Sequence, residues 1–291
     1  MKKIALLLLA ALMLFSLCSC ESADYRAATL LLKSGKYEAA EQKFLSLGEF
    51  EDAPEKVLRC RYEQAKELLK TGRYDEAQVS FEALGSYRDS AEQVQECSYL
   101  LAKKYLADKN FDQAKELLLT LSDYKDAKAL KKGLDWEALT AYFAETGDLT
   151  RSVSESCSTT LLLTEEALVM EYAWEFTETA KLDLVIRLSV DREENAALFG
   201  REHYEGFSEA WDAEAEGRLN LAEYKKGERV VWDRFDARGT SANGEKDNDI
   251  PAIPLKNLLS TALEEMTLHL ESTLRESECG VTMRDLGFVA Y

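Results

Sequence analysis

One spacing dominates the chain: chemically similar residues recur every 37 positions between residues 25 and 136. Three short segments carry an aromatic residue followed three positions later by Ala, and they are Gly35–Ala40, Gly72–Ala77 and Lys109–Ala114. A fixed period of this length is typical of arrays in which each unit buries its apolar face against its neighbours. Further positions keep the spacing, namely Tyr25, Tyr62, Tyr99 and Trp136; Phe50, Tyr87 and Tyr124; and Asp52, Asp89 and Asp126.

Each period predicts two antiparallel helices. In the second period, apolar residues follow helical spacing before Gly72 and again after it, from Tyr74 to Phe81. The recurring acids are expected to be helix N-caps, because an Asp side chain can accept a first-turn amide and suits the positive end of a helix. Two of them also stand three residues before a Glu, a capping-box spacing. The expected caps are Asp52, Asp89 and Asp126.

The run Gly-x-aromatic-x-x-Ala-x-x-x-Phe, as in Gly72, Tyr74, Ala77 and Phe81, resembles the tetratricopeptide repeat. The resemblance covers roughly Tyr25 to Leu149 and implies a short superhelix with a concave groove that holds peptides or partner domains. The chain departs from that family in its period, which is 37 rather than about 34 residues, and in lacking the Pro at the repeat end. The alternative is that the array is a rigid spacer.

The first twenty residues form a targeting segment. A basic start, Met1-Lys2-Lys3, precedes an uncharged apolar run of 12 residues, which suits a secretory signal and is too short to span a bilayer. The following Leu17-Cys18-Ser19-Cys20 resembles the bacterial lipobox. The resemblance implies that residues 1–19 are removed and that Cys20 carries diacylglycerol and palmitate, which places the protein on the extracytoplasmic face of the cell membrane. The alternatives are an ordinary signal peptide or an uncleaved anchor.

The hydrophobic pattern changes near residue 150. Apolar and polar residues then alternate, as in Met170–Phe176 and Leu182–Val190, which predicts antiparallel strands, and Leu255–Leu274 carries one apolar helical stripe. The predicted fold is a multi-domain chain in which an N-terminal all-α helical-hairpin repeat solenoid precedes an α+β domain, an antiparallel sheet with a C-terminal helix. The expected parts are the signal peptide (1–19), the repeats (20–150) and the sheet domain (151–291).

Net charge limits the partners. The chain carries −18 at neutral pH, with −6 in residues 21–150 and −14 in residues 151–291. Such a protein repels phosphate backbones, so no nucleic-acid partner is expected, and contact with an anionic bilayer requires the lipid anchor. The acidic excess of the sheet domain is either a solvated surface that maintains solubility or a docking surface for a basic partner or cations.

Four groups of residues in the second domain are candidate sites. Glu265 and His269, four apart on a helix, could chelate a metal, but a surface ion pair is the favoured interpretation. His203 lacks a recognisable Ser or Cys nucleophile context, and Asp247-Asn248-Asp249 lacks the Gly and Glu of a calcium loop, which favours a polar turn. Three aromatic residues could form an exposed patch, although a core position is favoured, and they are Tyr204, Phe207 and Trp211.

Four cysteines follow the targeting segment, two in the predicted repeats and two in the predicted sheet domain. Cys60 and Cys97 occupy one repeat position and are expected to be small core residues, too far apart for a disulfide. Cys157 and Cys279 could pair in an exported protein or remain free.

These observations predict a lipid-anchored, non-catalytic module that binds an unknown protein or peptide, with no catalytic residues, metal or cofactor. The alternative is a cell-envelope hydrolase with its site in residues 151–291, whose mark would be convergent carboxylates in a concave site.

Overall fold

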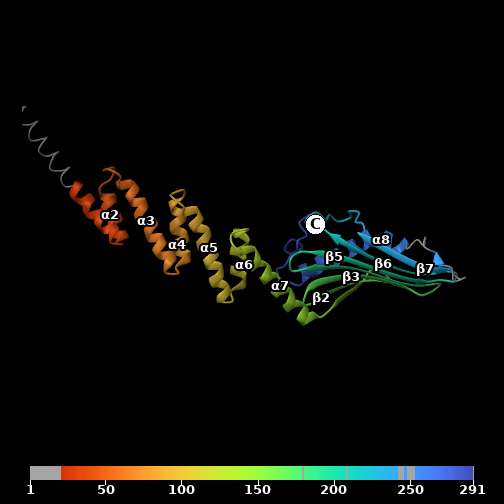
Figure 1. The fold of residues 1–291 in the computed structure, drawn as a ribbon. Helices are drawn as coiled ribbons and strands as arrows, with labels where there is room; N and C mark the ends of the chain where they lie inside the picture. The colour runs from red at the N-terminus through yellow and green to blue at the C-terminus, as the bar shows by residue number, and fades with distance from the viewer. Residues whose placement is uncertain (1–20, 179, 208, 242–245, 248–252, 291) are drawn as a thin grey trace, which may run out of the picture. The chain divides into compact units, whose positions relative to one another are not determined.

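A computed structural model describes residues 21–178, 180–207, 209–241, 246–247 and 253–290 of the chain. The chain divides into two compact units, 1–131 and 132–291, of which the first is described from residue 21 onward (Figure 1). The first unit is helical and the second is built on an antiparallel sheet, so the predicted combination of helices with a sheet is confirmed at this level.

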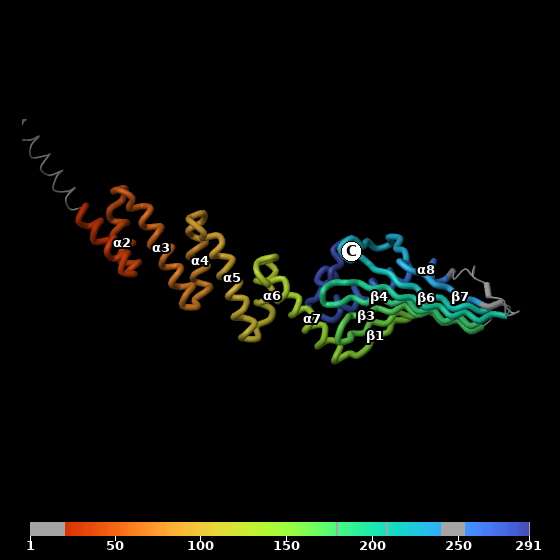
Figure 2. The backbone as a smooth tube through the Cα atoms, in the orientation of Figure 1, coloured from red at the N-terminus to blue at the C-terminus, as the bar shows by residue number. Residues whose placement is uncertain are grey.

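The helical unit alternates short and long helices. Residues 21–33 form the first helix, and the bounds of the others are α2 (Tyr37–Ser46), α3 (Ala53–Lys70), α4 (Tyr74–Leu84), α5 (Ser90–Ala107), α6 (Phe111–Leu121) and the start of α7 (Ala127–Thr146). From α2 to α6, each helix packs against the next one along the chain and runs back along it (Figure 2).

Residues 37 apart occupy matching places in this unit. Phe44 and Phe81 are fully buried, each beside small residues of its own hairpin and of the next one. Cys60 and Cys97 are buried free thiols, as expected of small core residues, and burial raises the pKa of each to about 11.

The recurring Asp residues act differently from the expected caps. Asp52 and Asp89 stand at the N-cap positions of α3 and α5, but neither side chain makes the cap hydrogen bond. The prediction of side-chain capping is therefore wrong for these two residues. Their backbones have ψ of 25° and 23°, away from the extended conformation that a capping side chain requires.

The Asp side chains instead accept hydrogen bonds from tyrosines 27 residues earlier. Tyr25 donates to Asp52, while the Tyr62 and Tyr99 hydroxyls donate to Oδ1 of Asp89 and Asp126, both at 2.5 Å. The cap role of Asp126 itself stays a prediction. Each bond ties the first helix of one period to the residue that precedes the first helix of the next.

The Tyr62–Asp89 bond shifts the pKa of both partners. Burial and the Asp89 carboxylate raise the pKa of Tyr62 to about 12, and the Asp52 bond raises that of Tyr25 to about 12. The tyrosine hydroxyls in turn lower the pKa of Asp89 and Asp126. A neutral phenol donating to an ionised carboxylate is a charge-assisted bond, stronger than one between neutral groups.

The turns also repeat in backbone conformation. Gly85 has φ 57° and ψ −119°, and Ser122, 37 residues later, has φ 47° and ψ −109°. Side chains rarely adopt this conformation, and no atom lies near the place where a Cβ would stand on Gly85, so the backbone alone accounts for the glycine. The third period retains the turn although Ser replaces Gly.

The second unit is an eight-stranded antiparallel sheet whose strands follow the order of the sequence. Helix α8 (Ile253–Glu276) packs across β2 to β5 on one face, close to the predicted helical stripe, and a short 3-10 helix η1 (Met283–Leu286) follows. The strands are β1 (Leu149–Ser152), β2 (Cys157–Leu163), β3 (Ala167–Phe176), β4 (Lys181–Asp191), β5 (Ala196–Glu205), β6 (Glu209–Leu219), β7 (Arg234–Ser241) and β8 (Lys246–Asp247).

The unit boundary differs from the one expected at residue 150. Trp136, Leu139 and Phe143 of α7 are buried in the same core as the strands and α8, so the second unit begins within α7, at residue 132. The sequence pattern misplaced this boundary because the aromatic Trp136 keeps the 37-residue spacing while packing against the sheet. No helix within the described ranges is long and apolar enough to cross a bilayer.

We expect Ser122→Gly to raise the free energy of unfolding by about 1 kcal/mol. Glycine removes a strained conformation that costs about 1–3 kcal/mol, and its larger unfolded-state entropy offsets part of the gain. Denaturant unfolding of the full chain measures the change. The reciprocal Gly85→Ser is the matched control and should lose a similar amount. An unchanged or lower stability for Ser122→Gly would contradict the strain assigned to this turn.

Candidate functional site

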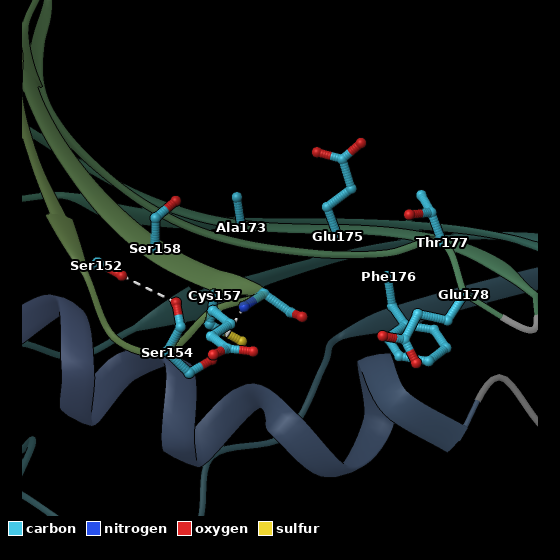
Figure 3. Close-up of a pocket in the computed structure, with 11 residues that line it drawn as sticks. Ser152, Ser154, Cys157, Ser158, Ala173, Glu175, Phe176, Thr177 and Glu178 are labelled. Carbon is cyan, nitrogen blue, oxygen red and sulfur yellow. Dashed lines mark hydrogen bonds between the residues drawn. The ribbon is translucent and has the colours of Figure 1, made fainter.

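The largest surface of the sheet without a helix over it is the face opposite α8, called here the open face. It is formed by alternate residues of β2 to β7. Ser158, Ala173 and Glu175 point to this side, whereas Cys157 and Phe176 point toward the helix (Figure 3). The strand register places Val185 and Phe199 on the same face. Both are half-buried and lie among the charged residues of β4 to β7.

The open face carries charges of both signs, and some of them stand opposite a charge of the other sign on the neighbouring strand, whereas Glu175 faces Asp183 and Glu214 faces Asp236. Arg187 Nε lies 2.5 Å from Glu171 Oε2, and Arg201 stands opposite Glu214 in the ladder. Opposite charges in directly facing positions stabilise an antiparallel pair. His203 adds to this pattern by pairing its Nδ1 with Asp212 Oδ1 at 2.7 Å.

Much of the acidic excess of the unit lies outside the open face. Residues 132–291 hold 33 acidic and 16 basic residues. Many of the acids lie in the turns and on or just after α8, among them Glu155, Glu165, Glu166, Glu178, Glu193, Glu194, Glu264, Glu271, Glu276 and Glu278. The excess is spread around the sheet and does not form one continuous patch on the open face.

A polar hollow of about 550 Å³ lies at the β1–β2 end of the sheet (Figure 3). Its lining combines serine hydroxyls with the carboxylates of Glu155, Glu175 and Glu178, and it includes Cys157. The described lining residues contain no His or Lys that could activate a hydroxyl or thiol. The Cys157 thiol accepts a hydrogen bond from the Tyr172 hydroxyl at 3.3 Å, so the hollow can offer acceptors to a donor-rich ligand.

The most deeply buried carboxylate belongs to Glu202, which is 0% exposed. Its Oε1 accepts the Trp211 indole N–H at 2.8 Å, and its Oε2 accepts the Leu255 amide at 2.9 Å, in the first turn of α8. Burial raises the pKa of Glu202. The residue thus fixes the start of α8 on the sheet, where a negative group also suits the helix dipole.

Gly200 supports the same junction, because a Cβ there would lie 2.6 Å from Leu255 Cδ1. Sequence reasoning missed Glu202. The sequence did offer a signal, because Glu202 falls on the apolar side of the alternating pattern. It lies two residues after Gly200 and four residues after Leu198.

The expected surface ion pair between Glu265 and His269 is wrong. Glu265 pairs with Arg151 at 3.0 Å, while His269 is 6% exposed and faces the Thr159 hydroxyl at 3.0 Å from its Nδ1. The helix face that carries both residues is turned toward the sheet edge, so His269 enters the core between α8 and β2. Burial, with a smaller contribution from Arg151, lowers the pKa of His269 to about 4.

The three aromatic residues of the predicted patch are in different environments. Tyr204 and Trp211 face each other across β5 and β6, stacked with ring centroids 3.9 Å apart, and Trp211 packs against the core. Phe207 lies in the turn between these strands and is fully exposed. The favoured core interpretation therefore fits Tyr204 and Trp211 in part and fails for Phe207.

The remaining candidates contribute no site. Cys157 and Cys279 are free thiols, and Cys279 accepts a hydrogen bond from Ser277. Within the Asp247-Asn248-Asp249 segment only the backbone of Asp247 is described, in β8, and Cys20 lies outside the described residues. The described part of the chain holds no cluster of three His, Cys, Asp or Glu suited to a metal.

The chain matches no protein-family model, no curated protein and no solved structure.

We expect the His269 imidazole to titrate near pH 4. Its folded pKa lies below the ordinary 6.5, so the unfolded state binds the extra proton first, and stability falls as pH drops from about 6.5 to 4. The chain has only two histidines, so His203→Gln leaves one imidazole to follow by NMR. A remaining imidazole that titrates in the ordinary range near 6.5 would contradict its burial as a neutral group.

Proposed function

We propose that the protein is a lipid-anchored module of the bacterial cell envelope that binds a protein or peptide without turning it over. In this proposal the helical unit is a repeat solenoid related to tetratricopeptide arrays, held at the extracytoplasmic face of the membrane by lipid on Cys20. The sheet unit is the partner-binding part, with the repeats as stalk or co-receptor.

The observation that carries the proposal is the recurrence of the Tyr–Asp bond. Three pairs 37 residues apart make the same contact, each across 27 residues of chain. An array of equivalent units gives an extended, regular surface, which repeat proteins use to hold other chains. Residues 37 positions apart are therefore alike in chemical type and also make the same hydrogen bond.

The open face supports a role of the sheet unit in binding. Its half-buried Val185 and Phe199 lie among paired charges of both signs, so a partner could bury apolar surface in the centre and meet polar groups around it. These charges largely compensate one another. The affinity of a partner that binds the open face should therefore depend only modestly on salt concentration. A contact through the acidic turns would instead weaken severalfold at high ionic strength.

Cys20→Ala should move the protein from the membrane fraction to the soluble fraction or leave it as unprocessed precursor. The lipid attaches through the thiol, and the variant removes that atom. Cys18→Ala is the matched control, because the bulky Leu17 before it fits the lipobox poorly, and it should fractionate like the unaltered protein. Membrane association and processing that persist in Cys20→Ala would contradict the anchor.

Crosslinking in cells that produce the protein tests whether the sheet unit binds a partner. A photo-crosslinking residue at Val185 of the full chain should capture a discrete envelope protein, and the same residue at Glu276, beyond the sheet, serves as control. Crosslinks that form from Glu276 but not from Val185 would assign the contact to the acidic surface, and crosslinks from neither site would remove the sheet unit from recognition.

A further inference from the structure

Strand β1 forms one edge of the sheet (Figure 2), and in the described part of the chain only β2 pairs with it. Val153 N donates to Cys157 O at 2.8 Å, so Arg151, two residues earlier, also directs its main-chain groups toward β2. These groups alternate in direction along an antiparallel strand, so those of Thr150 and Ser152 point away from the sheet. Both residues are exposed, and each presents one N–H and one C=O at the edge.

The single charged side chain of β1 does not guard this edge. Arg151 Nη2 lies 3.1 Å from the Glu265 carbonyl oxygen and 3.0 Å from Glu265 Oε2, so the guanidinium is held by α8. Edge strands often avoid unwanted pairing through charged side chains or prolines at the edge. The outward positions of β1 instead carry the small polar side chains of Thr150 and Ser152. The described part of the edge is therefore open to a further strand.

A hollow of about 550 Å³ lies between this edge and α8. Ser152 and Val153 line it from the sheet, and Leu268 and Ser272 line it from the helix. Val153 is 37% exposed and Leu268 is half-buried, so both offer apolar surface. The side chains of a strand paired with β1 would point alternately to the open face and into this hollow. In strand addition of this kind, the main chain provides affinity and such pockets provide specificity.

A second hollow, also of about 550 Å³, adjoins the first, because Glu271 and Arg275 of α8 line both. Its apolar lining comes from the end of α8 and the chain that follows, and Val289 within it is 55% exposed. An apolar side chain placed there would remove this surface from water, which is favourable. The other apolar lining residues are Leu274, Val281, Met283 and Phe288.

We propose that the β1 edge and these two hollows hold an extended segment of a partner protein, which adds to the sheet beside β1 and places an apolar side chain against Val289. The occupant is an extended chain because outward N–H and C=O groups on alternate residues match the main chain of another strand. This inference rests on the proposed binding of a protein or peptide and deepens it, since it adds a site distinct from the open face.

A phage library of random peptides, panned on the full chain in detergent micelles, supplies the probe. The selected peptides are synthesised, and their Kd is measured for the unaltered chain and for variants at residue 152. Ser152→Pro removes an outward N–H and leaves the bonds to β2 in place, and proline is tolerated at such edge positions. The matched control, Ser152→Ala, keeps the N–H and removes only the hydroxyl. We expect Ser152→Pro to weaken binding about tenfold and Ser152→Ala by less than about twofold.

Hydrogen exchange of the unaltered chain gives a readout that does not depend on the folding of a variant. The amides of Thr150 and Ser152 should exchange fast in the free protein and severalfold more slowly with peptide bound. The Arg151 amide, which faces β2, should be protected in both states.

Equal affinity for the unaltered and Ser152→Pro chains, or unchanged exchange at Thr150 and Ser152 with peptide bound, would overturn the edge site. Binding that is lost in Val185→Asp but kept in Ser152→Pro would assign recognition to the open face, which overturns the edge site and leaves the proposed function standing. A library that yields no binding peptide would also overturn it, and the crosslinks from Val185 then decide the proposed function separately. Dimerisation in sedimentation that Ser152→Pro abolishes would overturn it in favour of a second copy.

Discussion

The hydrogen bond from a tyrosine hydroxyl to an aspartate 27 residues later is the interaction on which the helical unit depends. It joins successive periods, and its aromatic ring packs edge-on against a second recurring aromatic residue, as Tyr62 does with Tyr87 and Tyr99 with Tyr124. A cation completes the arrangement in the later periods, with Arg88 5.0 Å from the Tyr62 ring centroid and Lys125 4.7 Å from that of Tyr99.

This bond depends on the turn at the end of each period. The aspartate ends a turn that includes Gly85 or Ser122, and the turn holds the acid where the preceding tyrosine can reach it. In the first period Glu51 stands where Arg88 and Lys125 stand later, so the cation is absent there while the hydrogen bond remains.

Much of the fold could be predicted from local pattern, and less of the site. Alternation identified the strands, and spacing identified the helices, because both record which side of an element is buried. The roles of Asp52 and Asp89 were misassigned since a capping acid and an acid bonded to a distant tyrosine look alike in sequence. The roles of Glu202 and His269 depend on how α8 lies over the sheet, and the charge pairing of the open face depends on strand register. Neither the packing of α8 nor the register of the strands can be read from composition.

A double-mutant cycle at Tyr62 and Asp89 tests the central claim most directly. Tyr62→Phe, Asp89→Asn and the double variant are unfolded with denaturant near neutral pH, below the ordinary tyrosine pKa of 10.0, where the bond is intact. A charge-assisted bond at a half-buried site predicts a coupling free energy of about 1–2 kcal/mol, so the double variant loses clearly less than the sum of the single losses. Additive losses, with no coupling between the two positions, would contradict the view that this bond joins the units.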